Sequence, residues 1–115
     1  MKFDEFQSGP PLSIMAALGP RFRGALEAAT SYAGFRKAIV DLNDNQDRGC
    51  FIDAARRYGG VCSAGERELL KGICLLCDFA QVADEISAGE AYVNMTRCGG
   101  DFRRAFAACI LHAGY

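Results

Sequence analysis

The sequence predicts an all-α protein: an irregular bundle of about five to six helices packed around a central long helix at about residues 64–86. Apolar residues recur at steps of three and four along most of the chain, which is the period of one helix face. Capping residues and glycines separate these stretches. The length of 115 residues is usual for one domain, so we expect a single helical domain over residues 1–115.

The first predicted helix is short and follows two prolines. Pro10 and Pro11 suit the first turn of a helix, because proline has its φ fixed and needs no backbone partner there. The helix covers residues 12–18, and Gly19 ends it. The preceding residues 1–9 are expected to be a flexible or docking N-terminal arm.

The second and third helices are separated by a polar loop. Pro20 opens a helix whose apolar stripe runs to residue 43, either as one continuous helix 20–43 or with a kink at Gly34. Asp47 then has the right chemistry to cap a third helix at about 48–58. Two consecutive glycines end that helix.

The fourth helix carries the clearest start signal. Ser63 and Glu66 have the spacing of a capping box, in which each side chain accepts from the other residue's backbone N–H. The apolar face of the helix at 64–86 is broad, as expected of a helix surrounded by others. Its polar strip is narrow and includes Lys71 and Cys74, so we expect Cys74 to be the most accessible cysteine.

Two further helices complete the predicted bundle. Ser87 and Glu90 repeat the capping-box spacing, which predicts a short fifth helix ending near residue 98. Asp101 caps a sixth helix at about 102–112. Its core face includes Cys109, which we therefore expect to be buried.

The composition indicates a soluble cytoplasmic chain. The first residues are too polar and acidic for a signal peptide, and no stretch approaches the roughly 18 apolar residues that span a bilayer. Thiols in the cytoplasm stay reduced, so the six cysteines are expected to be structural. Thirteen Lys and Arg balance fourteen Asp and Glu, which argues against direct nucleic-acid binding and against membrane binding.

Four residues have the spacing of a metal site. Cys74 and Cys77 form Cys-x2-Cys, and Cys109 and His112 form Cys-x2-His. Three thiolates and an imidazole suit tetrahedral zinc, so a small zinc-binding helical module is one alternative. We nevertheless expect no metal and no cofactor, because the four residues belong to apolar helices rather than to tight turns.

Residues 81–93 resemble the helix-turn-helix of bacterial regulators, with Ala83, Ile86 and Val93 at the apolar positions of that family. The resemblance implies a DNA-binding transcriptional regulator, which we keep as the first alternative function. The sequence departs from the family at Ser87, which replaces the turn glycine. The helix that would read DNA also contains no Lys or Arg, although phosphate contacts need cations.

The predicted function is binding of a protein or a nucleoprotein complex. No phosphate loop or nucleophile elbow is present, so no enzymatic activity is expected. Arg56, Arg57, Arg103 and Arg104 lie off the apolar stripes, and arginine is favoured at interfaces. They are therefore the candidate partner-binding residues, and a solvated face is the other interpretation. Convergence of the four on one surface would favour the DNA-binding alternative.

In its size and its lack of motifs the chain resembles the small inhibitors encoded by phages and mobile elements, anti-CRISPR proteins among them. The resemblance is one of type and involves no individual residue. It implies an inhibitor of a host protein or nucleoprotein complex. The identity of the partner and the oligomeric state stay open at this point.

Overall fold

The computed structural model describes residues 1–87 and 100–113. The all-α prediction is confirmed, because the described residues form eight α-helices and one short π-helix and no strand. The helices are α1 (Phe3–Ser8), α2 (Pro10–Leu18), α3 (Pro20–Ala28), α4 (Tyr32–Asp41), the π-helix η1 (Leu42–Gln46), α5 (Cys50–Gly59), α6 (Ala64–Leu76), α7 (Ala80–Ser87) and α8 (Gly100–Leu111).

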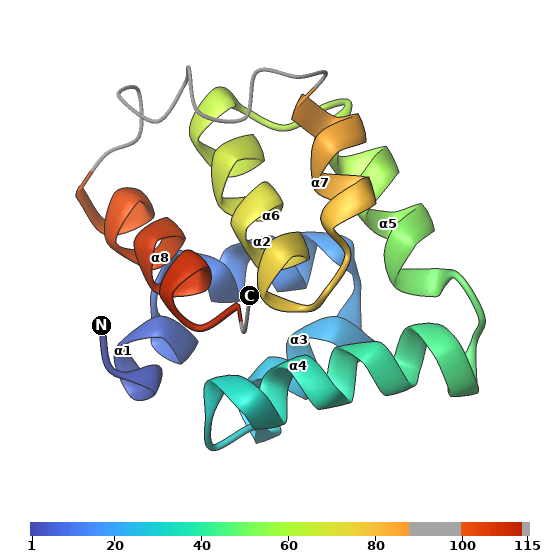
Figure 1. Cartoon of the computed structure of the whole chain (residues 1–115), viewed down its shortest axis with the longest axis horizontal. Coiled ribbons are helices and arrows are strands. Elements are labelled where there is room, and N and C mark those ends of the chain that lie inside the picture. The colour runs from blue at the N-terminus through green and yellow to red at the C-terminus, as the bar shows by residue number, and fades with distance from the viewer. Residues whose placement is uncertain (88–99, 114–115) are drawn as a thin grey trace.

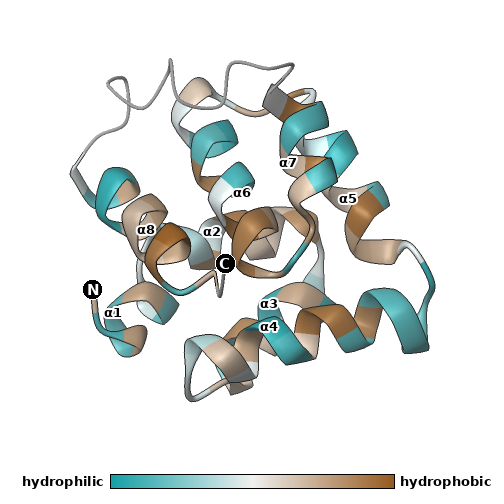
Figure 2. Cartoon of the chain, viewed as in Figure 1, coloured by the Kyte–Doolittle hydropathy of each residue, from teal (hydrophilic) through white to brown (hydrophobic). Residues whose placement is uncertain are grey.

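Helix α6 is the centre of the bundle. It packs against α8 on one side and α7 on the other, and it also contacts α2 and α5 (Figure 1). Its approach to α8 is close, because a Cβ atom added at Gly72 would lie 3.0 Å from Cδ2 of Phe106. Hydrophobic and hydrophilic segments alternate along the helices, as expected of amphipathic helices (Figure 2). No described helix is long and apolar enough to cross a membrane.

The single long helix predicted at 64–86 is wrong. The chain leaves the helix after Leu76, and Asp78 adopts a left-handed conformation with φ 67°. Asp tolerates this conformation better than most residues do, so it can reverse the chain without a glycine. The backbone N–H of Phe79 donates to the carbonyl of Cys74 at 2.7 Å and closes the turn. Helix α7 then folds back and packs along α6.

The segment 20–43 is neither continuous nor kinked at Gly34. It breaks after Ala28, and Ser31 caps the next helix by accepting a hydrogen bond from the backbone N–H of Gly34 at 3.0 Å. Gly34 therefore lies in the first turn of α4. The end of the same segment widens into the π-helix η1, where the N–H of Asp47 donates to the carbonyl of Leu42 at 3.0 Å.

The predicted cap of the third helix is also corrected. Asp47 does not cap α5, which begins after Gly49 in a left-handed conformation with φ 82°. The side chain of Asn43 performs the capping instead. Its Oδ1 accepts from the N–H of Phe51 at 3.1 Å and from the N–H of Ile52 at 3.2 Å. Asn43 is buried, so the π-helix is fastened to the start of α5.

The N-terminal segment forms helix α1 and belongs to the core. Phe6 is fully buried, and its ring lies 5.1 Å from that of Tyr32 and 6.2 Å from that of Phe35. Gln7 Nε2 donates to the carbonyl of Leu26 at 2.8 Å, at the end of α3. These contacts dock residues 1–9 against α3 and α4.

The capping box at the start of α6 is confirmed. The N–H of Glu66 donates to Ser63 Oγ at 3.3 Å, and the N–H of Ser63 donates to Glu66 Oε1 at 3.2 Å. The predicted sixth helix corresponds to α8. The predicted fifth helix, with its second capping box at Ser87 and Glu90, lies largely outside the described residues, as does the second half of the segment that resembles a helix-turn-helix.

Candidate functional site

Of the two arginines on α5, Arg56 belongs to an ion pair inside the molecule. Its Nε donates to Glu85 Oε2 at 2.8 Å, and a terminal nitrogen donates to Oε1 at 3.2 Å. This two-point contact joins α5 to α7, and the hydrogen bond from Arg56 lowers the pKa of the Glu85 carboxyl. The Arg56 guanidinium is therefore already paired within the chain.

Arg104 on α8 is occupied in the same way. It lies 3.2 Å from a carboxylate oxygen of Glu5 and 3.8 Å from one of Asp101. The backbone N–H of Lys2 and the guanidinium of Arg104 together lower the pKa of Glu5. The pair joins α8 to α1. Arg103, its neighbour on α8, is exposed.

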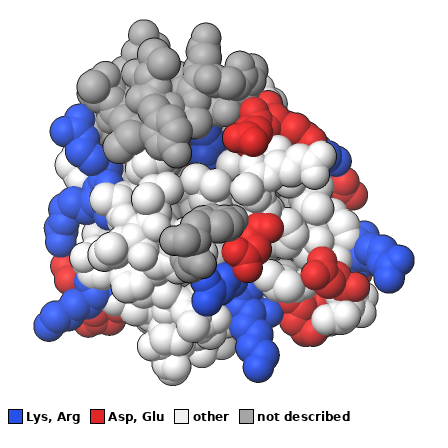
Figure 3. Space-filling view, in the orientation of Figure 1, with Lys and Arg blue, Asp and Glu red and all other residues white. Residues whose placement is uncertain are grey.

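The two arginine pairs do not converge. Helix α5 lies on one side of the bundle and α8 on the other, with α6 and α7 between them (Figure 1). On the face shown in Figure 3, basic side chains are scattered among acidic and uncharged ones. The convergence that would favour DNA binding is therefore not found among the described residues.

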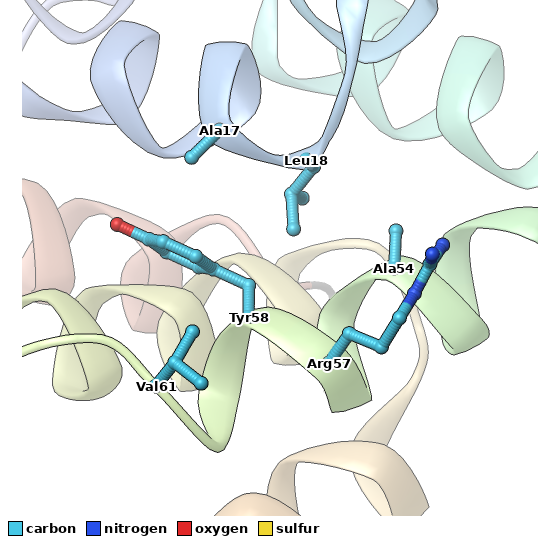
Figure 4. Close-up of a pocket in the computed structure, with 6 residues that line it drawn as sticks. All are labelled: Ala17, Leu18, Ala54, Arg57, Tyr58 and Val61. Carbon is cyan, nitrogen blue, oxygen red and sulfur yellow. The ribbon is translucent and has the colours of Figure 1, made fainter.

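A pocket of about 260 Å³ lies between the end of α2 and α5. Four aliphatic side chains, one guanidinium and one phenol line it: Ala17, Leu18, Ala54, Val61, Arg57 and Tyr58. Figure 4 shows Ala17 and Leu18 projecting from α2 toward Tyr58 and Val61, with the Arg57 guanidinium at the end away from the tyrosine hydroxyl.

A second pocket of about 310 Å³ adjoins the first. The two share Leu18, Ala54 and Arg57, so Arg57 lies where they meet. The second pocket is bounded by the starts of α3 and α5 and is charged. Its charged lining residues are Arg21, Asp47, Arg48, Asp53 and Arg57. We call the two pockets together the α2–α5 groove.

Arg57 differs from Arg56 and Arg104 because its guanidinium is not paired with a carboxylate of the described fold. Within the described part of the chain it makes no hydrogen bond and no ion pair, whereas Arg56 and Arg104 each pair with a carboxylate. Arg48 in the same groove is also exposed and has no described partner. Arg21 is held by Asp47, with their charged atoms 3.1 Å apart.

The apolar end of the groove is built around Tyr58 and Val61. The hydroxyl of Tyr58 donates a short hydrogen bond to Glu66, and burial together with this bond raises the pKa of Tyr58. The phenol thus stays neutral with its ring fixed between α5 and α6. Val61 follows the end of α5 and is 84% exposed. The groove therefore offers a guanidinium beside exposed apolar surface.

The four residues predicted as zinc ligands do not form a metal site, because the three thiols and the imidazole have separate surroundings. Cys74, Cys77 and Cys109 lie together in the core, where burial raises the pKa of Cys74 to about 12 and raises those of the other two thiols as well. The His112 ring instead stacks on Tyr32, with centroids 3.9 Å apart. No group of three or more described His, Cys, Asp or Glu residues could hold a metal ion.

The prediction for Cys109 is confirmed, and the prediction for Cys74 is wrong. Both thiols are fully buried. Cys74 belongs to the polar strip predicted for α6, but both α7 and α8 pack on α6 and the thiol is enclosed in the core. Cys50 and Cys62 are the more exposed of the cysteines that the structure describes.

Comparison with known proteins gives no match. No family model, no curated protein and no solved structure is significantly similar to the chain. Of the groove residues, only Arg57 was among the partner-binding residues predicted from the sequence. Val61 and Tyr58 carry no motif, and they meet Leu18 only because α2 and α5 pack side by side.

Proposed function

We propose that this protein acts by binding a macromolecular partner and that the α2–α5 groove is the contact surface. The observation that supports it best is Arg57, an exposed arginine without a described partner at the junction of two pockets. A free guanidinium beside apolar surface is typical of interface hot spots, because it can form two parallel hydrogen bonds and also stack. An inhibitor of the kind expected from the sequence would occupy its target through such a surface.

The groove lacks the set of groups that catalysis requires. Its charged side chains are three arginines and two aspartates. Its phenol, Tyr58, donates to Glu66 and has a raised pKa, which makes it a poor nucleophile. Cys50, which also lines the second pocket, donates its thiol to the carbonyl of Leu42 at 3.5 Å. These features support binding rather than chemistry.

Charge reversal at one arginine tests the proposal. Tagged wild-type protein, Arg57→Glu and Arg103→Glu are used to capture a partner from a lysate of the cells that encode the protein, and affinities are then measured with the purified partner. Arg57→Glu should lose about 2 kcal/mol or more of binding free energy, as at a hot spot. Arg103→Glu on α8 is the matched control and should bind normally.

Both substitutions are at exposed positions, where even a surface ion pair contributes little, so each should change the free energy of unfolding by about 1 kcal/mol or less. Thermal melts of the same samples therefore separate loss of contact from loss of fold. Normal binding by a folded Arg57→Glu variant would overturn the proposal. Loss of binding in Arg103→Glu alone would move the contact surface to α8.

A further inference from the structure

We infer that the α2–α5 groove binds an acidic peptide segment of the partner, with a carboxylate at Arg57 and Arg48 and an apolar side chain in the pocket beside Val61. The inference depends on the proposed function, because it names the chemistry of the partner at the same surface. Three features support it: the free cations, the uncapped start of α3 and the exposed apolar end of the groove.

The charged pocket contains more arginines than aspartates. Arg21 and Asp47 satisfy each other at 3.1 Å, which leaves Arg48 and Arg57 against Asp53. Neither of these two arginines has a partner in the described structure. A guanidinium matches a carboxylate with two parallel N–H···O bonds, so a side-chain carboxylate of Asp or Glu is the group that this pocket lacks.

The start of α3 adds a weaker attraction of the same sign. Gly19 and Pro20 line the charged pocket, and no side chain caps α3 there. The positive end of a helix dipole favours an anion. The neighbouring α5 differs, because Asn43 already accepts from the first amides of that helix.

The other end of the groove presents exposed apolar side chains. Val61 is 84% exposed and borders a pocket whose remaining walls include Leu18, Ala17 and the Tyr58 ring (Figure 4). Removing this surface from water favours binding of an aliphatic or aromatic side chain. Since Arg57 separates the two pockets, the carboxylate and the apolar side chain must be near neighbours in the bound segment.

The mixed charge of the groove favours a peptide over nucleic acid. Asp47 and Asp53 line the same pocket as the arginines, and they would repel a backbone that carries one phosphate per nucleotide. A peptide can place a single carboxylate at the free arginines and avoid the aspartates. The net charge of −1 also gives no general attraction to a polyanion.

Selection of peptides on the folded protein tests the inference. A display library of random linear peptides is selected on the immobilised wild-type protein. Enriched peptides should share Asp or Glu within a few residues of an aliphatic or aromatic residue. Their affinity should fall at least about tenfold on Arg57→Glu and on Arg48→Glu, the loss expected for a charged hydrogen bond, and should be unchanged on Arg103→Glu.

Peptides selected on Val61→Asp should no longer be enriched in aliphatic or aromatic residues. Enrichment of Asp and Glu is tested separately with Arg57→Glu. The inference is overturned by enrichment of basic or neutral peptides, by equal binding to wild type and Arg57→Glu, or by no enrichment at all. Binding of duplex DNA that is lost in Arg57→Glu would also overturn it. If partner capture still depends on Arg57 in these cases, the proposed function stands without the acidic peptide, and the two failures are distinguished.

Discussion

At the scale of single residues, Lys71 and Glu68 form an ion pair inside the bundle. Lys71 Nζ lies 2.5 Å from Glu68 Oε1, and both side chains are at most 2% exposed. The second carboxylate oxygen of Glu68 has no hydrogen-bond partner within the described structure. Such pairs recover little more than their desolvation cost, but removing one member leaves a buried charge uncompensated.

Lys71→Met should therefore destabilise the protein by about 3–5 kcal/mol. The double variant Glu68→Leu/Lys71→Met removes both charges and should be clearly more stable than the single variant, because no unpaired charge is left. Urea unfolding of the wild type and both variants measures the difference. A cost below about 1 kcal/mol for Lys71→Met would show that the lysine reaches solvent.

The cysteines give a second prediction at the same scale. Burial raises the pKa values of Cys74, Cys77 and Cys109, so their thiolates are scarce at neutral pH as well as inaccessible. Cys50 and Cys62 are only partly buried. A thiol reagent should label these two before the three buried thiols, as measured by peptide mapping over time. Early labelling of Cys74 would mean that the core around α6 opens readily.

At the scale of elements, helix starts were more predictable than helix breaks. The capping box at Ser63 and Glu66 was readable, because both partners lie within one turn. The break at Asp78 was not, since neither glycine nor proline marks it and the packing of α7 on α6 involves residues beyond the turn. The break before Tyr32 is marked in the sequence only by Ser31, a favourable N-cap residue. The apolar stripe continues past this serine and therefore predicted a continuous helix.

Asn43 provides a test of an element boundary. Asn43→Ala should destabilise the protein by about 1–2 kcal/mol, because the side chain caps the first amides of α5. Asp47→Ala removes only an exposed ion pair with Arg21 and should cost less than about 1 kcal/mol. Denaturant midpoints of the two variants compare the caps directly. A larger loss of stability in Asp47→Ala than in Asn43→Ala would show that Asp47, and not Asn43, caps α5.

At the scale of the whole molecule, the candidate surface exists only because distant segments meet. Leu18 on α2 and Val61 after α5 are separated by more than forty residues of sequence and line one pocket. Composition and periodicity predicted the helical class and four exposed arginines. They could not predict that Arg56 and Arg104 would pair with Glu85 and Glu5 while Arg57 stayed free.

The chain offers a matched pair of exposed apolar residues for testing which surface binds. Val61 beside the groove is 84% exposed, and Leu111 at the end of α8 is 75% exposed. Either can be replaced by the photo-crosslinking residue p-benzoylphenylalanine with little expected effect on the fold, since neither contributes to the core. The two positions sample different faces with similar chemistry.

Photo-crosslinking from these two positions, followed by mass spectrometry of the partner, shows whether the α2–α5 groove is the contact surface. Position 61 should crosslink to the captured partner, the crosslink should be lost when Arg57→Glu is added, and position 111 should give none. Efficient crosslinking from position 111 and none from position 61 would contradict the proposal, and would place the contact surface on α8.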